Sequence, residues 1–233
     1  MTRAGDPRER ASRDWYGYGR WAAPYWFIGM EPGGADDAKS YEAWEALGAD
    51  DLIDCRAHHM SSTNPLWTKW HLKDRPPTQP TWRRLIQLML AYQGEPTCLD
   101  RVREIQRSDW GSLTGKVALL EVSAIHSPSL SKVDLESPLV KDRLRILRKR
   151  LAKDEPEFAV FYGLGYQRYY ESVVGEAFDD DGFTWCGPTL CALTPGPTSA
   201  RGDAWGRAEW WIAKGNEIRD RLAGATRRTQ AGS

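Results

Sequence analysis

Four short segments of the sequence are predominantly apolar, without the alternation of polar and apolar residues that a half-exposed strand shows. They are residues 24–30 (PYWFIGM), 116–125 (KVALLEVSAI), 157–165 (EFAVFYGLG) and 189–197 (TLCALTPGP). Each segment leads into glycine, proline or small polar residues. Strands that are buried on both faces have this character, which is typical of parallel sheets covered by helices. The pattern therefore predicts four strands of one buried sheet.

The segments between these strands have helical periodicity. Residues 80–94 place Leu85, Leu88, Met89 and Tyr92 on one helix face, and residues 137–154 have leucines at similar spacing. A shorter helix is predicted at 165–178. Strands that alternate with helices predict an α/β fold, a three-layer α/β/α sandwich around a four-stranded, mainly parallel sheet.

One region has no sustained periodicity. Residues 35–79 contain the segments HHM, STNPLW and RPPTQP, and we expect a long functional loop region there, with one short helix at 40–48.

The length of 233 residues fits a single domain. Polar, arginine-rich residues 1–20 predict a flexible N-terminal arm, residues 21–222 form the domain, and residues 223–233 are expected to be a disordered tail. No apolar run approaches the roughly 18 residues of a membrane helix, and the N-terminus lacks a secretory signal. We therefore expect a cytoplasmic monomer that does not contact a membrane.

Charge and cysteine content exclude little. The 32 basic residues balance 32 acidic ones, so no overall field indicates a nucleic-acid partner, although a local basic stripe is still compatible with that balance. The four cysteines form no C-x-x-C pair. Their spacing predicts free thiols and neither a metal site nor any other cofactor.

In an open parallel sheet, ligands bind outside the carboxyl ends of the strands. Here those ends carry Glu31 in GMEPGG, Glu121 and His126 in LEVSAIHSPS, and the rigid loop TPGPTS. Each has a simpler interpretation: a turn with a solvated acid at Glu31, a carboxylate that pairs with a basic side chain at Glu121, and a surface or capping histidine at His126. The loop TPGPTS, with Arg201 beyond it, offers amides, hydroxyls and a cation for a phosphate, or only terminates a strand.

Two of these strand ends together resemble a known family. Gly29-Met30-Glu31-Pro32-Gly33 is similar to the first motif of the uracil-DNA glycosylase superfamily, and 194–199 (TPGPTS) is similar to its last motif. A third segment, HHMSSTNPLW (58–67), resembles a loop of the mismatch-specific branch. The chain is identified as a divergent member of this superfamily.

The resemblance implies roles for the catalytic residues. Glu31 takes the place of the residue that positions the hydrolytic water, and a fixed carboxylate there would also stabilise the sugar cation formed during bond cleavage. Thr194 replaces the histidine that binds the leaving base, and His126 is a candidate to compensate for it. The resemblance thus implies three catalytic residues: Glu31, Thr194 and His126.

It also implies contacts to the base and to DNA. Met60 stands at the base-stacking position, with His59, Trp67 and Tyr25 as alternatives, and Glu121 replaces the base-reading asparagine. The implied base-binding residues are Gly29, Met30, Pro32, Gly33, His59, Met60, Glu121 and Ser123. The implied DNA-binding residues are Pro195, Gly196, Pro197, Thr198, Ser199 and Arg201, with Arg201 as the side chain that fills the gap left by a flipped base.

The expected function is hydrolysis of the N-glycosidic bond of uracil, or of another deaminated base, in single- or double-stranded DNA. One alternative is a protein of the same fold that binds uracil or abasic DNA with little turnover. A second alternative is a hydrolase or transferase of free nucleosides or nucleotides, which the balanced charge supports.

Overall fold

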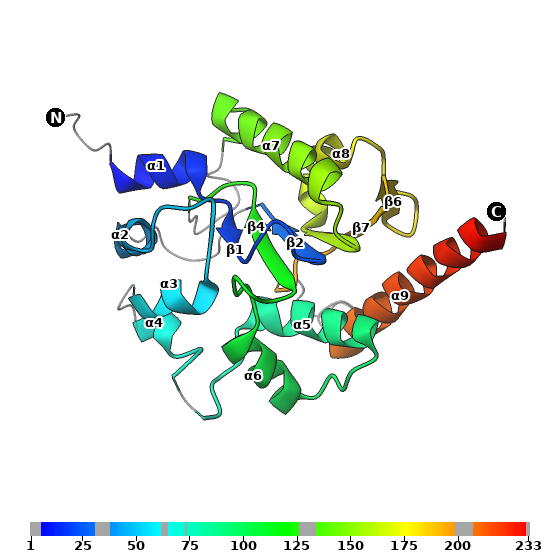
Figure 1. Cartoon of the computed structure of the whole chain (residues 1–233), viewed down its shortest axis with the longest axis horizontal. Coiled ribbons are helices and arrows are strands. Elements are labelled where there is room, and N and C mark those ends of the chain that lie inside the picture. Colours follow the sequence, from blue (N-terminus) through cyan, green and yellow to red (C-terminus); the bar gives the residue numbers. More distant parts are fainter. Residues whose placement is uncertain are drawn as a thin grey trace.

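A computed structural model describes residues 6–30, 38–61, 65–72, 74–125, 134–198 and 207–231. One mixed sheet of seven strands forms the centre of this described part, in the order β3-β1-β4-β2-β5-β7-β6 (Figure 1). The strands are β1 (Gly17–Tyr18), β2 (Tyr25–Gly29), β3 (Leu52–Ile53), β4 (Val117–Glu121), β5 (Phe158–Tyr162), β6 (Phe183–Cys186) and β7 (Thr189–Thr194).

The four predicted strands are confirmed as β2, β4, β5 and β7, which lie side by side and run parallel. The prediction of a four-stranded sheet was wrong, because β1 pairs antiparallel with β4, β3 extends that edge, and β6 pairs antiparallel with β7 at the other edge. The three additional strands were missed for a physical reason. β1 and β3 have two residues each, and β6 carries the partly exposed Trp185, so none of them forms a continuous apolar run.

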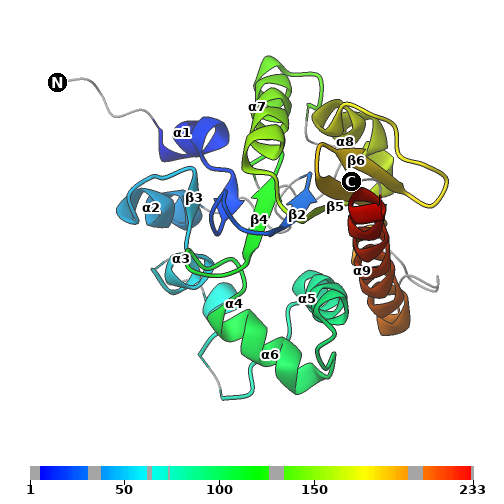
Figure 2. The ribbon, with the colours of Figure 1, turned by 45° about the vertical axis from the view of Figure 1, so that its right-hand side comes forward.

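Helices cover both faces of the sheet (Figure 2). Alternate residues of each strand separate to the two faces, as the period of a β-strand requires. Trp26 and Ile28 pack with α7 and α8, whereas Phe27 packs with α5, α6 and α9. The helices are α1 (Pro7–Asp14), α2 (Ala38–Ala46), α3 (Cys55–Ser61), α4 (Pro65–Thr68), α5 (Pro80–Gln93), α6 (Leu99–Ser108), α7 (Pro138–Asp154), α8 (Gln167–Val174) and α9 (Ala208–Ala231).

The predicted terminal and loop segments differ from the structure. Residues 7–18 form α1 and β1, with Trp15 and Tyr16 buried, rather than a flexible arm. The predicted tail from residue 223 continues α9 as far as Ala231. The region 35–79 contains α2, β3, α3 and α4, where only one short helix was expected. Within the described residues, no helix is both long enough and apolar enough to cross a membrane.

The sheet order places β2 between β4 and β5, although β4 and β5 follow it in the chain. The chain therefore moves first to one side of β2 and then to the other. Such a reversal opens a crevice beyond the carboxyl ends of the strands. Residues at the ends of β2, β4 and β5 are the ones that this topology brings together.

Candidate functional site

The carboxyl ends of the four parallel strands lie at the same end of the sheet. Gly29 pairs with Glu121 between β2 and β4, and Tyr162 pairs with Thr194 between β5 and β7. By the alternation along their strands, these residues lie on the sheet face that also carries Phe27 and α5. We call Gly29, Glu121, Tyr162 and Thr194 the strand-end cluster.

The side chain of Glu121 is held by a tyrosine. The Tyr162 hydroxyl donates a hydrogen bond to Glu121 Oε1 at 3.0 Å. Burial, and then the negative charge of Glu121, raises the pKa of Tyr162 well above its usual value, so the hydroxyl keeps its proton and remains a donor. Arg143 donates to the main-chain oxygen of Glu121, at 2.9 Å. No motif in the sequence indicates a role for Tyr162. Only the register of the strands shows that it lies beside Glu121.

Gly29 makes room for this pair. A Cβ atom at residue 29 would lie 2.4 Å from Glu121 Oε2 and 2.4 Å from the Tyr162 hydroxyl oxygen. Real Cβ atoms do not approach other atoms so closely, and both neighbours are linked to each other. The strand-end cluster therefore favours glycine at residue 29, the first residue of the motif that contains Glu31.

We expect Gly29→Ala to lower the free energy of unfolding by about 1 to 3 kcal/mol, because the added methyl group must displace Glu121 and Tyr162. Gly165→Ala is the matched control, since a Cβ there meets no atom within 4 Å. Urea unfolding followed by tryptophan fluorescence measures both variants. Equal stability of the two variants would contradict the close contact at Gly29.

Thr194 is fully buried, and its hydroxyl donates to the main-chain oxygen of Phe161 at 3.3 Å. The role implied for it, a hydrogen bond to the leaving base, stays a prediction. That role would require the hydroxyl to turn away from β5.

The predicted base-binding residues Met30 and Ser123 lie together. Ser123 N donates to Met30 O at 2.7 Å, and both side chains are buried. Ser123 Oγ accepts a hydrogen bond from Ile125 N at 3.2 Å, which leaves its hydroxyl hydrogen available as a donor. In the loop after β7, Pro195 and Pro197 are buried, Gly196 is half-buried and Thr198 is exposed.

Several predicted site residues lie outside the described residues. They are Glu31, Pro32, Gly33, His126, Ser199 and Arg201. Their predicted roles therefore rest on the sequence alone.

Three of the four candidates for base stacking lie on α3 and α4, where the ring centres of His59 and Trp67 are 5.2 Å apart, and Tyr25 lies elsewhere. Met60 lies in α3 with 37% of its surface exposed, while His59 is buried and stacks on Trp82 with ring centres 5.4 Å apart. Tyr25 is the first residue of β2 and stacks on Phe158, the first residue of β5. It lies at the amino ends of the strands, so the suggestion that Tyr25 stacks on a base at their carboxyl ends was wrong.

A second group of polar side chains lies beside β1. The His58 ring accepts a hydrogen bond from the Tyr18 hydroxyl at Nδ1 (2.9 Å) and donates from Nε2 to Ser40 O (2.9 Å). His59 Nδ1 and His71 Nε2 are 3.0 Å apart. We call Tyr18, Cys55, His58, His59 and His71 the histidine cluster. Of the histidine cluster, only His59 was a predicted site residue, because the members come together only in the fold.

Burial dominates the electrostatics of the histidine cluster. It lowers the pKa of His71 to about 4, with a smaller effect from the positive charge of Arg56. Burial also raises the pKa of the Cys55 thiol well above its usual value, and the negative charge of Asp54 raises it further by a smaller amount. Burial, with smaller effects from Cys55 and Glu121, raises the pKa of Tyr18 well above its usual value.

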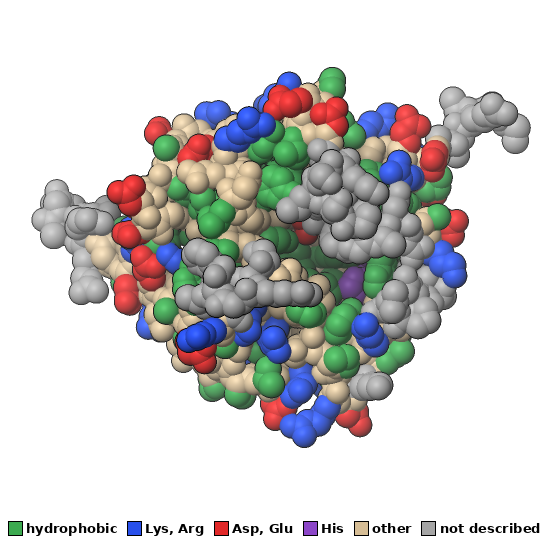
Figure 3. Space-filling model, turned by 180° about the vertical axis from the view of Figure 1, so that it is seen from behind, with side chains coloured by type: hydrophobic (Ala, Val, Ile, Leu, Met, Phe, Trp, Pro, Cys, Tyr) green, Lys and Arg blue, Asp and Glu red, His purple; other side chains and the backbone are tan. Residues whose placement is uncertain are grey.

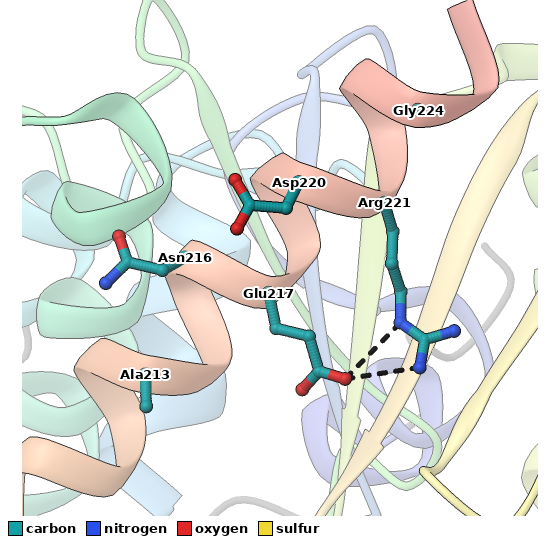
Figure 4. Close-up of a pocket in the computed structure, with 6 residues that line it drawn as sticks. All are labelled: Ala213, Asn216, Glu217, Asp220, Arg221 and Gly224. Atoms are coloured by element: carbon teal, nitrogen blue, oxygen red, sulfur yellow. Dashed lines mark hydrogen bonds and ion pairs between the residues drawn. The ribbon is translucent and has the colours of Figure 1, made fainter.

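The surface view adds a hollow near the centre of one face, with hydrophobic side chains on its floor, a histidine at its edge, and Lys and Arg side chains nearby (Figure 3). A separate depression on α9 contains no strand-end residue, and its Arg221 bonds to Glu217 at 3.2 Å (Figure 4). It is lined by Ala213, Asn216, Glu217, Asp220, Arg221 and Gly224. These residues all belong to α9, and the charged ones, Glu217, Asp220 and Arg221, are in ion pairs.

Comparison of the sequence with protein-family models and with curated protein sequences finds no match. The interpretation of the site therefore depends on its own geometry and on the motifs in the sequence.

Proposed function

We propose that this chain is a base-excision protein that hydrolyses the N-glycosidic bond of uracil in DNA, as a divergent relative of the uracil-DNA glycosylases. One observation carries the proposal. The strands that bear the two family-like motifs, β2 and β7, run parallel and are separated only by β5, so their carboxyl ends lie at the same end of the sheet. A carboxylate, Glu121, lies there beside Gly29 on the neighbouring strand β4. Gly29 is the first residue of the motif that contains Glu31.

The arrangement fits recognition of a flipped base. Glu121 accepts a hydrogen bond from Tyr162, and a carboxylate is the kind of group that can accept from the N3–H of uracil. Ser123, two residues along the chain, retains a hydroxyl hydrogen that can be donated to a base oxygen. The half-buried acceptor Glu121 and the buried donor Ser123, two residues apart at one strand end, match the opposite polarity of the N–H and C=O groups on a uracil edge.

A specific observation also favours a second candidate, a protein that binds uracil or abasic DNA with little turnover. Thr194 occupies the position implied for leaving-group stabilisation, but its hydroxyl is fully buried and bonds to the backbone of β5. Without a donor at that position, cleavage of the glycosidic bond is slower. Recognition of the base by Glu121 would be unaffected.

The test uses single- and double-stranded oligonucleotides that contain one uracil, with the corresponding thymine oligonucleotides as matched controls. Free base, abasic strand and bound DNA are resolved after incubation with the full chain. We expect release of uracil and retention of thymine. Binding without release supports the second candidate. An absence of both binding and release overturns the DNA proposal and leaves a nucleoside substrate to be tested.

A further inference from the structure

The histidine cluster contains three metal-ligating side chains that the proposed glycosylase chemistry does not use. Cys55 and His59 lie one turn apart on α3. His71 lies in the turn after α4, where its backbone N–H donates to Thr68 O. One ligand atom from each of the three side chains lies within 4.8 Å of the others, and all three side chains are buried. We propose that Cys55, His59 and His71 bind a zinc ion, which fastens α3 to the turn that follows α4.

The separation of the ligands suits such an ion. Tetrahedral zinc with bonds of about 2.0 to 2.3 Å holds its ligand atoms roughly 3.3 to 3.8 Å apart. Within the described cluster the separations reach at most 4.8 Å, and the facing nitrogens of His59 and His71 are 3.0 Å apart. Small side-chain rotations would therefore bring the three atoms around one ion. A thiolate with two imidazoles is a donor set that favours zinc over magnesium or calcium.

The hydrogen bonds around His59 prepare it as a ligand. Ser40 O can only accept, so a neutral His58 carries its hydrogen on Nε2 and accepts from the Tyr18 hydroxyl on Nδ1. The Tyr18 oxygen can then accept from His59 Nε2, which is 3.5 Å away. This tautomer directs the lone pair of His59 Nδ1 toward His71. Zinc-bound histidines are commonly oriented in this way through their second nitrogen.

His71 adds an independent observation. Its side chain is 3% exposed, and its Nδ1 atom is buried without a hydrogen-bond partner among the described residues. A buried polar atom left unsatisfied costs about 1 to 3 kcal/mol, so an ordinary core histidine would be expected to satisfy both nitrogens. A ring with one nitrogen unsatisfied and the other facing a second imidazole is better explained by a ligand that engages this pair.

Zinc binding requires the ligand atoms to lose protons. The Cys55 thiol releases its proton to solvent as the sulfur–zinc bond forms, and the hydrogen between His59 and His71 leaves the line between the two rings, either to the other nitrogen of His71 or to solvent. Three protein ligands leave one tetrahedral position, which water can fill. The flat contact of His59 with Trp82 excludes water from one side of the site.

The experiment uses the full chain, with any affinity tag removed, after dialysis against a chelator. Cobalt(II) is added as a spectroscopic probe and zinc(II) is then titrated to displace it. We expect one equivalent of cobalt, with the visible bands of tetrahedral coordination and a thiolate-to-cobalt charge-transfer band. Cys55→Ser should remove the charge-transfer band, and His71→Ala should weaken zinc binding by more than about 100-fold. Cys98→Ser, at an exposed cysteine outside the cluster, should change neither.

Circular dichroism establishes that each variant is folded before it is compared. Tyr18→Phe keeps the ring and removes only the hydroxyl, and it should weaken zinc binding by about 10- to 100-fold while the charge-transfer band remains. If a ligand variant fails to fold, the wild-type spectrum decides the question. No charge-transfer band in folded wild type, or an unchanged band in folded Cys55→Ser, would overturn the proposal. Uracil release is measured separately, so that loss of this site and loss of the proposed function are distinguishable.

Discussion

Arg143→Met is expected to lower the free energy of unfolding by about 3 to 5 kcal/mol, which is a large part of the stability of a domain of this size. Arg143 is 1% exposed and extends from α7 to the ends of α1 and β4. Its guanidinium donates to five main-chain oxygens, those of Ser12, Arg13, Trp15, Glu121 and Val122. Methionine fills similar space and donates to none of them.

The charge of Arg143 is retained in the fold. Burial lowers its pKa to about 10, partly opposed by Tyr16 and Glu121, so the guanidinium is still protonated at neutral pH. Its face also lies 4.0 Å from the centre of the Tyr16 ring. Removal of the side chain would leave buried carbonyl oxygens without donors, at a cost of about 1 to 3 kcal/mol for each one that water cannot reach.

Arg145→Met is the matched control, two residues further along the same helix. Arg145 is exposed and pairs with Asp142 at 3.3 Å, and a surface ion pair of this kind contributes about 0 to 1 kcal/mol. Urea unfolding of both variants, followed by the fluorescence of the 12 tryptophans, gives the comparison. If Arg143→Met were as stable as Arg145→Met, Arg143 would not connect the N-terminal segment to the sheet as described.

Arg143 also illustrates what could not be predicted from the sequence. The four central strands and the helices α5 and α7 were predictable, because continuous apolar runs and a 3.6-residue period are local signals. The attachment of the N-terminal segment depends on a basic side chain more than 120 residues away, as the bond between Arg143 Nη2 and Trp15 O shows with its separation of 128 residues. A charged residue in the middle of a basic helix carries no local sign that it is buried.

The residues of the candidate site also include some that the sequence predicts and some that it does not. The strand-end rule located Gly29, Glu121 and Thr194, because it depends only on where apolar runs stop. It did not locate Tyr162, which is the last residue of β5 but lies inside the apolar run 157–165, although its hydroxyl bonds to a carboxylate 41 residues away. The histidine cluster was missed for the same reason, since Cys55 and His59 share a helix face that could be recognised only once 55–61 was known to be helical.

Glu31→Gln is expected to reduce uracil release by about 100- to 10,000-fold, the range for loss of a general base. The reasoning rests on the proposed function. Glutamine keeps the size of the side chain and its ability to hydrogen-bond, but it can neither take a proton from water nor neutralise a positive charge on the sugar. Binding of uracil-containing DNA should change little, because the phosphate and base contacts are proposed for other residues.

Single-turnover release of uracil and the affinity for an uncleaved oligonucleotide are measured in parallel for Glu31→Gln. Glu176→Gln, at an exposed glutamate next to the end of α8, is the matched control and should behave as wild type. Loss of release with retained binding identifies Glu31 as a catalytic residue. Wild-type rates of release in Glu31→Gln would contradict that role, and they would move the search for the reactive group to Glu121, the carboxylate that pairs with Gly29 at the carboxyl ends of β4 and β2.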